Sequence, residues 1–392
     1  MLDTARHFIP VQMIFRVLRQ MAMCKLNVFH WHITDAVSFP LSLKTRPELA
    51  SKGAFSSRQI YSSEDVRHII EFAQKLRIRV VPEIDTPAHA ASWMRAFPHI
   101  GVNCTWIVPE DSSQQNNPYK RLDVLTLHPT SSETREVVDD VLRDVAEIFP
   151  DRFVHIGADE TNHRCWSEDT SLNHMSPKIA ERKFLQKNIE TLSKYSKRTI
   201  VWQEAFDSST LRNDIVVMTW KCWGSPMTVG DQSMSKALAS GLNVIQTQCW
   251  YLDWDSNWQS MYKQHVDARS LGGEAAMWTE RVDFTNLECR IWPRAFVVAE
   301  RLWSETVETE KDFSFRLKYQ SSKLDLWIHN DLKSASSATT VQESCSLLKS
   351  QSIQRDMDAF SRFVADRKGS QNYHSDVVED RKRSQNYHND EL

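Results

Sequence analysis

The feature of this sequence that most constrains its fold is a repeated alternation of short apolar runs, rich in β-branched residues, with longer amphipathic stretches. The first pattern is typical of strands, and the second is typical of helices that bury one face. Strands that alternate with helices indicate a parallel sheet, and this many units favour a closed barrel over an open sheet. The predicted strands are residues 26–33, 78–84, 153–156, 199–202, 215–220, 242–247 and 274–278, and the predicted helices are residues 11–23, 63–76, 132–149, 177–195, 234–240 and 291–303.

A (β/α)₈ barrel needs one more strand, and residues 1–4 are the only place for it. Because this run is short, the chain is expected to begin inside its own first strand, which would leave the neighbouring strands partly unpaired. The predicted fold is therefore an α/β TIM barrel over residues 1–330 with a truncated first strand, followed by a C-terminal helical extension at 331–363. Residues 364–392 carry a polar tandem repeat and are expected to form a disordered tail.

Polar and aromatic residues recur at the carboxyl ends of the predicted strands. In a (β/α)₈ barrel these ends converge on one face, where the active site lies. Each residue alone could belong to a structural pair, but repetition at strand after strand is hard to obtain from packing alone. The residues are His32, Asp35, Asp85, His89, Asp159, Glu160, Trp202, Trp220, Tyr251, Asp253, Trp278 and Glu280.

The strongest local signal is a pair of adjacent carboxylates, Asp159 and Glu160, at the tip of the run 153–160. A turn at a strand end can aim both side chains at one ligand, although successive side chains on a strand point apart. A like charge nearby raises the pKa of one carboxyl, as a general acid near neutral pH requires. The alternative is a solvated Asp-Glu pair that opens a helix, the usual case for such a pair on its own.

Further motifs stand in a fixed order around this pair, and the series closely resembles glycoside hydrolase family 20, the β-N-acetylhexosaminidases. The resemblance covers roughly residues 2–330, and so many ordered motifs make it specific. The motifs lie at residues 3–10, 27–35 with 38–41, 82–89, 155–160 with 165–166, 201–204, 250–253, 277–280 and 292–303.

The resemblance implies a retaining exo-β-N-acetylhexosaminidase that removes terminal, β-linked N-acetylglucosamine or N-acetylgalactosamine. Glu160 looks like the general acid/base, and Asp159 looks like the partner that orients the 2-acetamido group of the substrate. In this family the acetamide carbonyl attacks the anomeric carbon and gives an oxazolinium intermediate, an exception to the two-carboxylate scheme. Neither a metal nor an organic cofactor is implied.

The resemblance also implies a set of substrate-binding residues. A fixed guanidinium fork suits two vicinal sugar hydroxyls. Asp35 and His89 are expected to support the acid pair, with a purely structural role as the alternative. Arg6 and Glu280 are expected to bind the sugar hydroxyls. Tryptophan side chains are expected to form walls around the ring and the acetyl methyl, from Trp202, Trp220 and Trp278. Tyr251 is expected to contact the acetamide oxygen, and Asp253 the O4/O6 edge.

Several positions depart from the family pattern. Ala158 and Ala88 replace glycines that usually precede the acidic pair and the histidine, and each adds a methyl group where the backbone is tightly placed. Ala36 stands where many relatives carry a second aspartate. Relatives also carry a longer first strand, a small preceding α+β domain and a signal peptide. With a frayed first strand, Arg6 is expected to be poorly positioned.

Cysteines, signals and charge indicate the compartment and the partners. Seven cysteines without a CxxC pair suggest neither a disulfide scaffold nor zinc. The resemblance implies a Cys104–Cys165 bridge, and the other cysteines are expected to be small core residues. Asn103 opens a glycosylation sequon, and the final His-Asn-Asp-Glu-Leu is close to a signal for retention in the endoplasmic reticulum.

These signals favour the secretory pathway, as lysosome, extracellular space or endoplasmic reticulum lumen, although no signal peptide follows Met1. No run is long and apolar enough for a membrane helix. The net charge of -3 implies no nucleic-acid partner. The expected partner is a glycoconjugate with a terminal hexosamine, and the family makes a homodimer possible.

Two other functions compete with this one. A metal-dependent amidohydrolase would use His30 and His32, which share a strand face, but the later strand ends supply tryptophans and carboxylates instead of further ligands. A glycan-binding relative, impaired by its truncated N-terminus or its alanines, would bind sugars without hydrolysis. The intact acid pair weighs against that second alternative. The natural substrate stays open among N-glycans, chitooligosaccharides and glycolipids.

Overall fold

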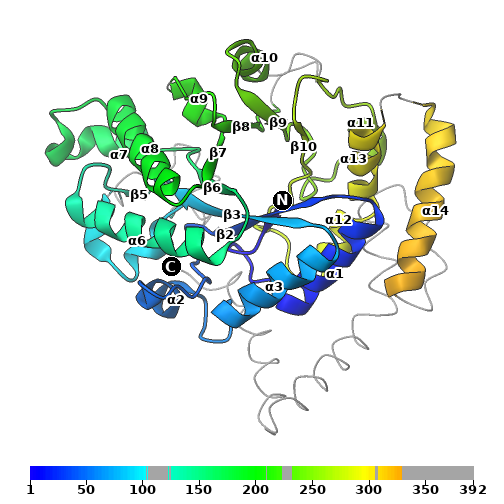
Figure 1. Ribbon diagram of the computed structural model, residues 1–392, viewed down its shortest axis with the longest axis horizontal. Helices are drawn as coiled ribbons and strands as arrows, with labels where there is room; N and C mark the ends of the chain where they lie inside the picture. Colours follow the sequence, from blue (N-terminus) through cyan, green and yellow to red (C-terminus); the bar gives the residue numbers. More distant parts are fainter. Residues whose placement is uncertain are drawn as a thin grey trace, which may run out of the picture.

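In the computed structural model the described residues are 1–102, 104, 122, 125–208, 210–222, 232–304 and 308–328. Within them, eight parallel strands form one curved sheet in the order β1-β2-β3-β6-β7-β8-β9-β10 (Figure 1). Neighbours in space are therefore neighbours in the chain, as in a TIM barrel. The strands are β1 Leu2–Asp3, β2 Val28–Thr34, β3 Arg79–Thr86, β6 Phe153–Gly157, β7 Arg198–Trp202, β8 Val216–Thr219, β9 Asn243–Gln246 and β10 Gly272–Gly273, and a separate antiparallel pair joins β4 Gly101–Val102 to β5 Thr126–Leu127.

The sheet closes between β1 and the segment that follows β10. Leu2 bridges Met277 in parallel, and the backbone N–H of Asp3 donates to the Met277 carbonyl at 3.0 Å. On its other side β1 pairs with β2, with Leu2 opposite Trp31. The two residues of β1 thus pair on both sides, but the register covers only Trp31 and His32 of β2, so the start of β2 has no partner in β1 and the expected partial unpairing is found there.

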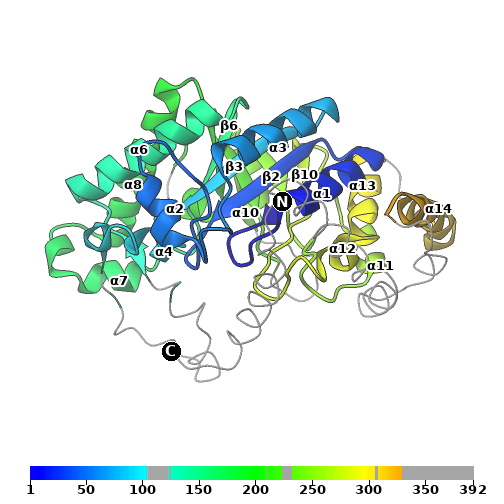
Figure 2. The same cartoon turned by 90° about the horizontal axis from the view of Figure 1, so that it is seen from below.

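Helices cover the outside of the barrel, and α14 lies at the edge of the molecule beside α13 (Figures 1 and 2). The predicted helix over 291–303 corresponds to α13, which begins after Pro293, and Ile291 is instead the last residue of the separate helix α12. The helices are α1 Val11–Met23, α2 Pro47–Gly53, α3 Ser63–Lys75, α4 Ala91–Met94, α6 Ser132–Ile148, α7 His163–Glu168, α8 Pro177–Lys194, α9 Glu204–Ser208, α10 Gln232–Ala239, α11 Trp258–Tyr262, α12 Leu287–Ile291, α13 Arg294–Trp303 and α14 Glu310–Ile328.

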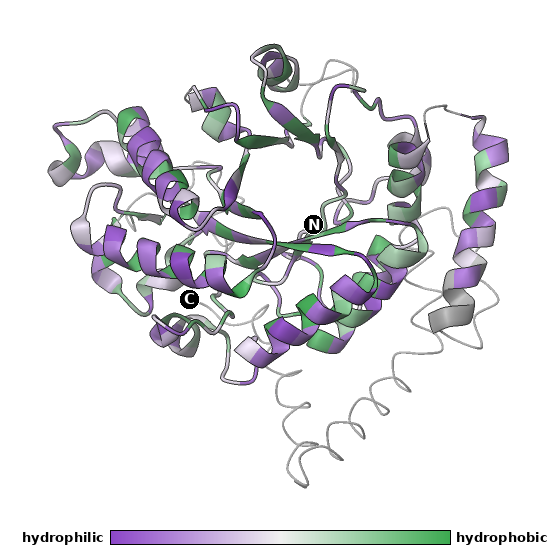
Figure 3. Ribbon diagram, in the orientation of Figure 1, coloured by the Kyte–Doolittle hydropathy of each residue, from purple (hydrophilic) through white to green (hydrophobic). Residues whose placement is uncertain are grey.

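Strand β2 shows how the sequence separates the core from the barrel interior. Phe29, Trp31 and Ile33 belong to the main hydrophobic core between strands and helices. The alternate residues His30 and His32 face inward and contact a carboxylate of β3. This alternation follows from the two-residue period of a strand. In Figure 3 the helices α3, α6 and α8, which lie outside the strands, carry both hydrophilic and hydrophobic residues, as amphipathic helices do.

Two disulfides whose cysteines both lie within the described residues connect loops at the carboxyl ends of the strands. Cys104 and Cys165 are bonded with their Cα atoms 5.5 Å apart, which confirms the predicted bridge. Cys222 and Cys249 form a second bridge with a Cα separation of 5.4 Å. The expectation that the remaining cysteines are core residues is therefore wrong for this pair, because the segments after β8 and β9 lie next to each other in the sheet.

Some predictions fall on other parts of the chain. The sequon residue Asn103 and the segments 331–363 and 364–392 lie outside the described residues. Among the helices of the described ranges, none combines the length and the apolar character that crossing a membrane requires.

Candidate active site

The turn after β6 gives Asp159 and Glu160 different surroundings. Gly157, Ala158 and Glu160 all have positive φ, at 67°, 71° and 47°. A Cβ at Gly157 would lie 1.6 Å from an oxygen of Asp85, so only glycine fits there. This unusual backbone buries Asp159, which is 8% exposed, and leaves the Glu160 side chain 46% exposed.

Asp159 shares its buried surroundings with a second carboxyl, Asp85 at the end of β3. Burial, and then the neighbouring Asp159, hold the pKa of Asp85 well above its usual range. Burial also raises the pKa of Asp159 to about 6, with the charge of Glu160 adding to the effect and His89 opposing it. Because two buried carboxyls in contact do not both ionise readily, the pair retains a proton to a higher pH than either group would alone.

His89 joins the acid pair to Asp35. Its Nδ1 lies 3.6 Å from Asp35, and its Nε2 lies 3.4 Å from Glu160 and 3.9 Å from Asp159. Burial alone would lower the pKa of His89, but these carboxylates hold it well above its usual range. Burial would likewise raise the pKa of Asp35, yet Arg6 and His89 hold it well below the usual value. The result is a cationic imidazole between two carboxylates.

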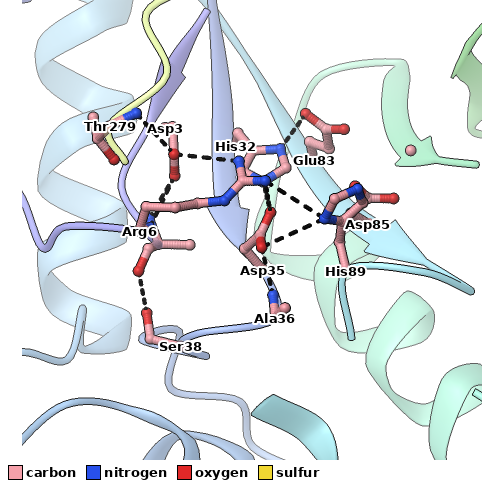
Figure 4. Close-up of polar contacts among 12 residues, drawn as sticks. Asp3, Arg6, His32, Asp35, Ala36, Ser38, Glu83, Asp85, His89 and Thr279 are labelled. Carbon is pink, nitrogen blue, oxygen red and sulfur yellow. Dashed lines mark hydrogen bonds and ion pairs between the residues drawn. The ribbon is translucent and has the colours of Figure 1, made fainter. Parts of the chain in front are cut away.

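Arg6 lies among residues of the first motif and of the segment that follows β10 (Figure 4). Its guanidinium lies 2.9 Å from Asp35, 3.3 Å from Asp3 and 3.9 Å from Glu280. It also stacks over the ring of Trp278 at 4.9 Å. The expectation that Arg6 is poorly positioned is therefore wrong, because β1 is paired on both sides and Asp3 is anchored by the Thr279 N–H at 3.1 Å.

The three predicted wall tryptophans lie in one cluster. Trp202 is buried, and Trp220 and Trp278 pack as partly buried side chains against the cluster that contains it. The rings of Trp202 and Trp278 are 6.1 Å apart. Carboxylates orient two of the three indole N–H groups. Trp202 donates to Glu83 at 2.8 Å, and Trp220 donates to Glu204 at 2.8 Å.

Tyr251 and Asp253 follow β9 and lie beside these tryptophans. The Tyr251 hydroxyl donates to the Trp220 carbonyl at 2.8 Å, and its ring stacks on Trp254. Among the described residues, nothing hydrogen-bonds to the buried Oδ1 of Asp253. Burial, and then the charge of Glu280, raise the pKa of Asp253 to about 7. An orphaned carboxylate oxygen of this kind is suited to a hydroxyl donor.

The site also contains acidic residues to which the sequence analysis gave no role. Asp85 was noted only as a strand-end residue, and Asp3, Glu83 and Glu204 were not singled out. Glu83 had a detectable signal, since a charged residue within an apolar strand must find partners when both faces are buried. Burial, and then Asp159, raise the pKa of Glu204 to about 7.

Three buried groups in the barrel have a composition that could hold a metal ion. They are His30, Glu83 and His155; His32, Glu83 and Asp85; and Asp35, Asp85 and His89. In the first two groups each histidine has a ring nitrogen 2.7 to 3.2 Å from Glu83. The His32 contact is a hydrogen bond, whereas Nε2 of His30 makes no hydrogen bond within the described residues and Nδ1 of His155 accepts from the Gly157 N–H. His30 and His32 do share one face of β2, as the amidohydrolase alternative required.

Comparisons with known proteins identify the family. The family described as "Glycosyl hydrolase family 20, catalytic domain" matches residues 1–306. The chain is 36% identical over 337 residues to the β-hexosaminidase subunit beta of Homo sapiens, which covers 80% of this chain and 58% of that protein. The chain belongs to glycoside hydrolase family 20. The resemblance read from its motifs is confirmed, and the chain spans little more than half the length of that relative.

Solved structures of family 20 enzymes share the barrel. The exo-β-N-acetylglucosaminidase of Vibrio harveyi, in complex with N-acetylglucosamine, has a TM-score of 0.71 at 26% identity over 83% of this chain and 57% of that one. The chitobiase of Flavobacterium johnsoniae has a TM-score of 0.73 at 23% identity over 97% of this chain and 65% of that one. The second likeness concerns the fold alone.

Proposed function

We propose that this family 20 chain is a retaining exo-β-N-acetylhexosaminidase that uses the acetamide of its own substrate as the nucleophile. The observation that carries the proposal is the contrast between Asp159, buried beside Asp85, and Glu160, half exposed beside His89. Adjacent carboxyls in such different surroundings are suited to different tasks. Family membership and the N-acetylglucosamine held by the V. harveyi relative support a terminal β-linked N-acetylhexosamine as the substrate.

In the proposed first step, Glu160 gives its proton to the glycosidic oxygen as the leaving group departs. Asp159 accepts a hydrogen bond from the acetamide N–H, which makes the acetamide oxygen a better nucleophile. That oxygen bonds to the anomeric carbon as the glycosidic C–O bond breaks, and a cyclic oxazolinium results. The carboxylate of Asp159 then stabilises the positive charge on the ring nitrogen.

In the proposed second step, Glu160 acts as a base. It takes a proton from a water molecule, which attacks the anomeric carbon from the face that the leaving group vacated. The bond from the anomeric carbon to the acetamide oxygen breaks, and the acetamide is restored. Two inversions at the same carbon retain the configuration of the sugar.

The remaining predicted residues are proposed to position the sugar. Arg6 and Glu280 hold ring hydroxyls, and the unpartnered oxygen of Asp253 accepts from the O4/O6 edge. The three tryptophans pack around the ring, whose C–H faces suit indole surfaces. Tyr251 reaches the acetamide oxygen if its hydroxyl turns away from the Trp220 carbonyl.

We also propose a secretory location for this enzyme. Disulfides persist in oxidising compartments and are rare in the cytosol. The bridges Cys104–Cys165 and Cys222–Cys249 support that assignment. The contacts of His89 with Glu160 and Asp159, and of Asp85 with Asp159, support turnover over glycan binding without hydrolysis.

Glu160→Gln is the direct test of the acid assignment. The amide cannot donate a proton to the leaving group, so kcat for substrates with poor leaving groups should fall by about 10²–10⁴-fold while binding changes little. The measurement is steady-state kinetics on a chitooligosaccharide beside a 4-nitrophenyl N-acetyl-β-glucosaminide, whose good leaving group needs less protonation.

Two further compounds test participation of the acetamide. A thiazoline that mimics the cyclised intermediate should inhibit competitively, and a plain 4-nitrophenyl β-glucoside should not react. Wild-type rates for Glu160→Gln on the chitooligosaccharide would refute the acid assignment. Efficient cleavage of the glucoside would refute the substrate-assisted mechanism.

A further inference from the structure

Inside the barrel, beneath the strand tips, lies a carboxylate with an unusual number of partners. Glu83 of β3 is fully buried, at 0% exposure. One of its oxygens lies 2.7 Å from Nδ1 of His32 and 2.9 Å from Nε2 of His30. The other accepts from the Trp202 indole at 2.8 Å and lies 3.2 Å from His155. Side chains from β2, β6 and β7 thus converge on one carboxylate.

His32 connects this network to the candidate active site (Figure 4). Its second nitrogen, Nε2, lies 2.9 Å from Asp35. Asp35 in turn pairs with Arg6 at 2.9 Å and faces His89 at 3.6 Å. His89 is the residue whose other nitrogen faces Glu160. A continuous series of polar contacts therefore joins Glu83 to the acid/base.

We infer that Glu83 is a positioning residue, which orients the wall indole of Trp202 and, through a doubly protonated His32, the Asp35–His89 pair. The inference rests on the proposed function, because its consequence is measured on that reaction. It adds a residue that contacts no substrate atom and acts from the layer below the site.

Geometry alone defines the charge of His32. Both of its ring nitrogens face carboxylate oxygens at hydrogen-bond distance, and both can donate only if the imidazole is cationic. In agreement, burial would lower the pKa of His32, but Glu83 and Asp35 hold it well above its usual range. The charged or titratable groups that face Glu83 are His30 and His32 from β2, Asp85 from β3, His155 and Asp159 from the β6 end, and the Met1 amine.

Glu83→Gln removes the charge and keeps the shape. The amide oxygen can still accept from Trp202, but its NH₂ group now faces His32, which becomes neutral. The charge of Glu83 also raises the pKa of Asp159, the carboxylate that must ionise in the proposed mechanism, so the acid limb of the kcat/KM profile should move to lower pH in this variant. Because the Asp35–His89 pair is no longer held in place, kcat should fall by roughly tenfold or more, and KM should stay within about threefold.

Glu274→Gln is the matched control. Glu274 lies in the same interior layer, 2.9 Å from His30, and no described contact joins it to His32 or Trp202. This variant should keep the wild-type position of the acid limb and a kcat within about threefold. An equal shift in both variants would overturn the inference, since it would reflect the total interior charge. So would a wild-type profile for Glu83→Gln.

A measurement on the unmodified protein covers the case in which Glu83→Gln does not fold. In wild-type chain labelled with ¹⁵N-histidine, both His32 nitrogens should give imidazolium shifts at pH 7.5, and a neutral tautomer would overturn the inference. This signal does not require turnover. A wild-type chain that hydrolyses no N-acetylhexosaminide would refute the proposed function itself, whereas activity with a neutral His32 would refute only the role of Glu83.

Discussion

Asp159 and Glu160 are neighbours in the sequence, yet the backbone gives them opposite surroundings. The positive φ at Ala158 and at Glu160 turns one side chain inward to Asp85 and leaves the other half exposed. Burial raises the pKa of Asp159 to about 6, so above that pH Asp159 can be the carboxylate that its proposed role requires.

Asp159→Asn should show that this arrangement costs stability. The pKa of Asp159 rises from 3.8 to about 6 on folding, so between these values the unfolded chain releases the proton first. The folded state then loses stability as the pH rises through this window, and the loss remains above it. The uncharged amide should stabilise the protein at pH 7.5, by on the order of 1–2 kcal/mol, and hardly at pH 3.5. Thermal unfolding at both pH values is the measurement.

The surface residue Asp214 provides a control of opposite sign. Its hydrogen bond with Arg212 lowers its pKa, so Asp214→Asn should lose a little stability at pH 7.5 and less at pH 3.5. The same Asp159→Asn variant should lose about a hundredfold in kcat, because the oxazolinium loses its counter-charge. A variant that is less stable than wild type at pH 7.5 would contradict the burial argument.

At the scale of elements, the turn after β6 explains the cost of the Ala158 departure. Ala158 has a φ of 71°, in the left-handed region that is unfavourable for a residue with a Cβ. Ala88, which also replaces a family glycine, does not have a positive φ. The folded chain nevertheless holds Ala158 in this conformation. Its backbone N–H donates a hydrogen bond to the Asp85 carboxylate at 3.3 Å. The family glycine would remove strain at only one of the two positions.

Ala158→Gly should therefore stabilise the protein by about 0.5–1 kcal/mol, the left-handed penalty of alanine less the extra unfolded-state entropy of glycine. Ala88→Gly should destabilise it by about 0.5–1 kcal/mol, since only the entropy term applies there. Urea unfolding of both variants checks the difference. Equal effects at the two positions would show that the φ at residue 158 is not strained.

For the whole molecule, loops at the carboxyl end of the barrel carry the site, and disulfides restrain them. The bridge Cys104–Cys165 closes a loop of 61 residues that includes the acid pair. The bridge Cys222–Cys249 closes 27 residues next to Trp220 and Tyr251. Each cross-link reduces the freedom of the unfolded chain, with a larger effect for the longer loop.

Replacement of both Cys104 and Cys165 by serine should lower the free energy of unfolding by up to about 4 kcal/mol, the loop-closure value for 61 residues. Cys24→Ser is the control, because Cys24 is a free thiol, and it should cost far less. Denaturant unfolding of the two variants is the measurement. An equal loss in both would mean that the bridge contributes nothing beyond the removal of a thiol.

Much of the barrel could be predicted because the evidence for it is local. The predicted strands at 78–84 and 199–202 correspond to β3 and β7, and the helix at 11–23 is α1. The strand predicted at 274–278 was less accurate: β10 is Gly272–Gly273, and Ala276 and Met277 form only isolated bridges. Pairing with β9 and β1 decides where that segment is a strand, and no local pattern encodes it.

The sequence by itself determined the alternating units, the order of motifs and the acidic pair, because each depends on residues that are close along the chain. Only the tertiary structure decided how Arg6 is held, which cysteines join, and that Glu83 connects Trp202 to His32. These features depend on segments tens to hundreds of residues apart. Strand order and register bring such segments together, and a buried charge is stable only where that register supplies its partners.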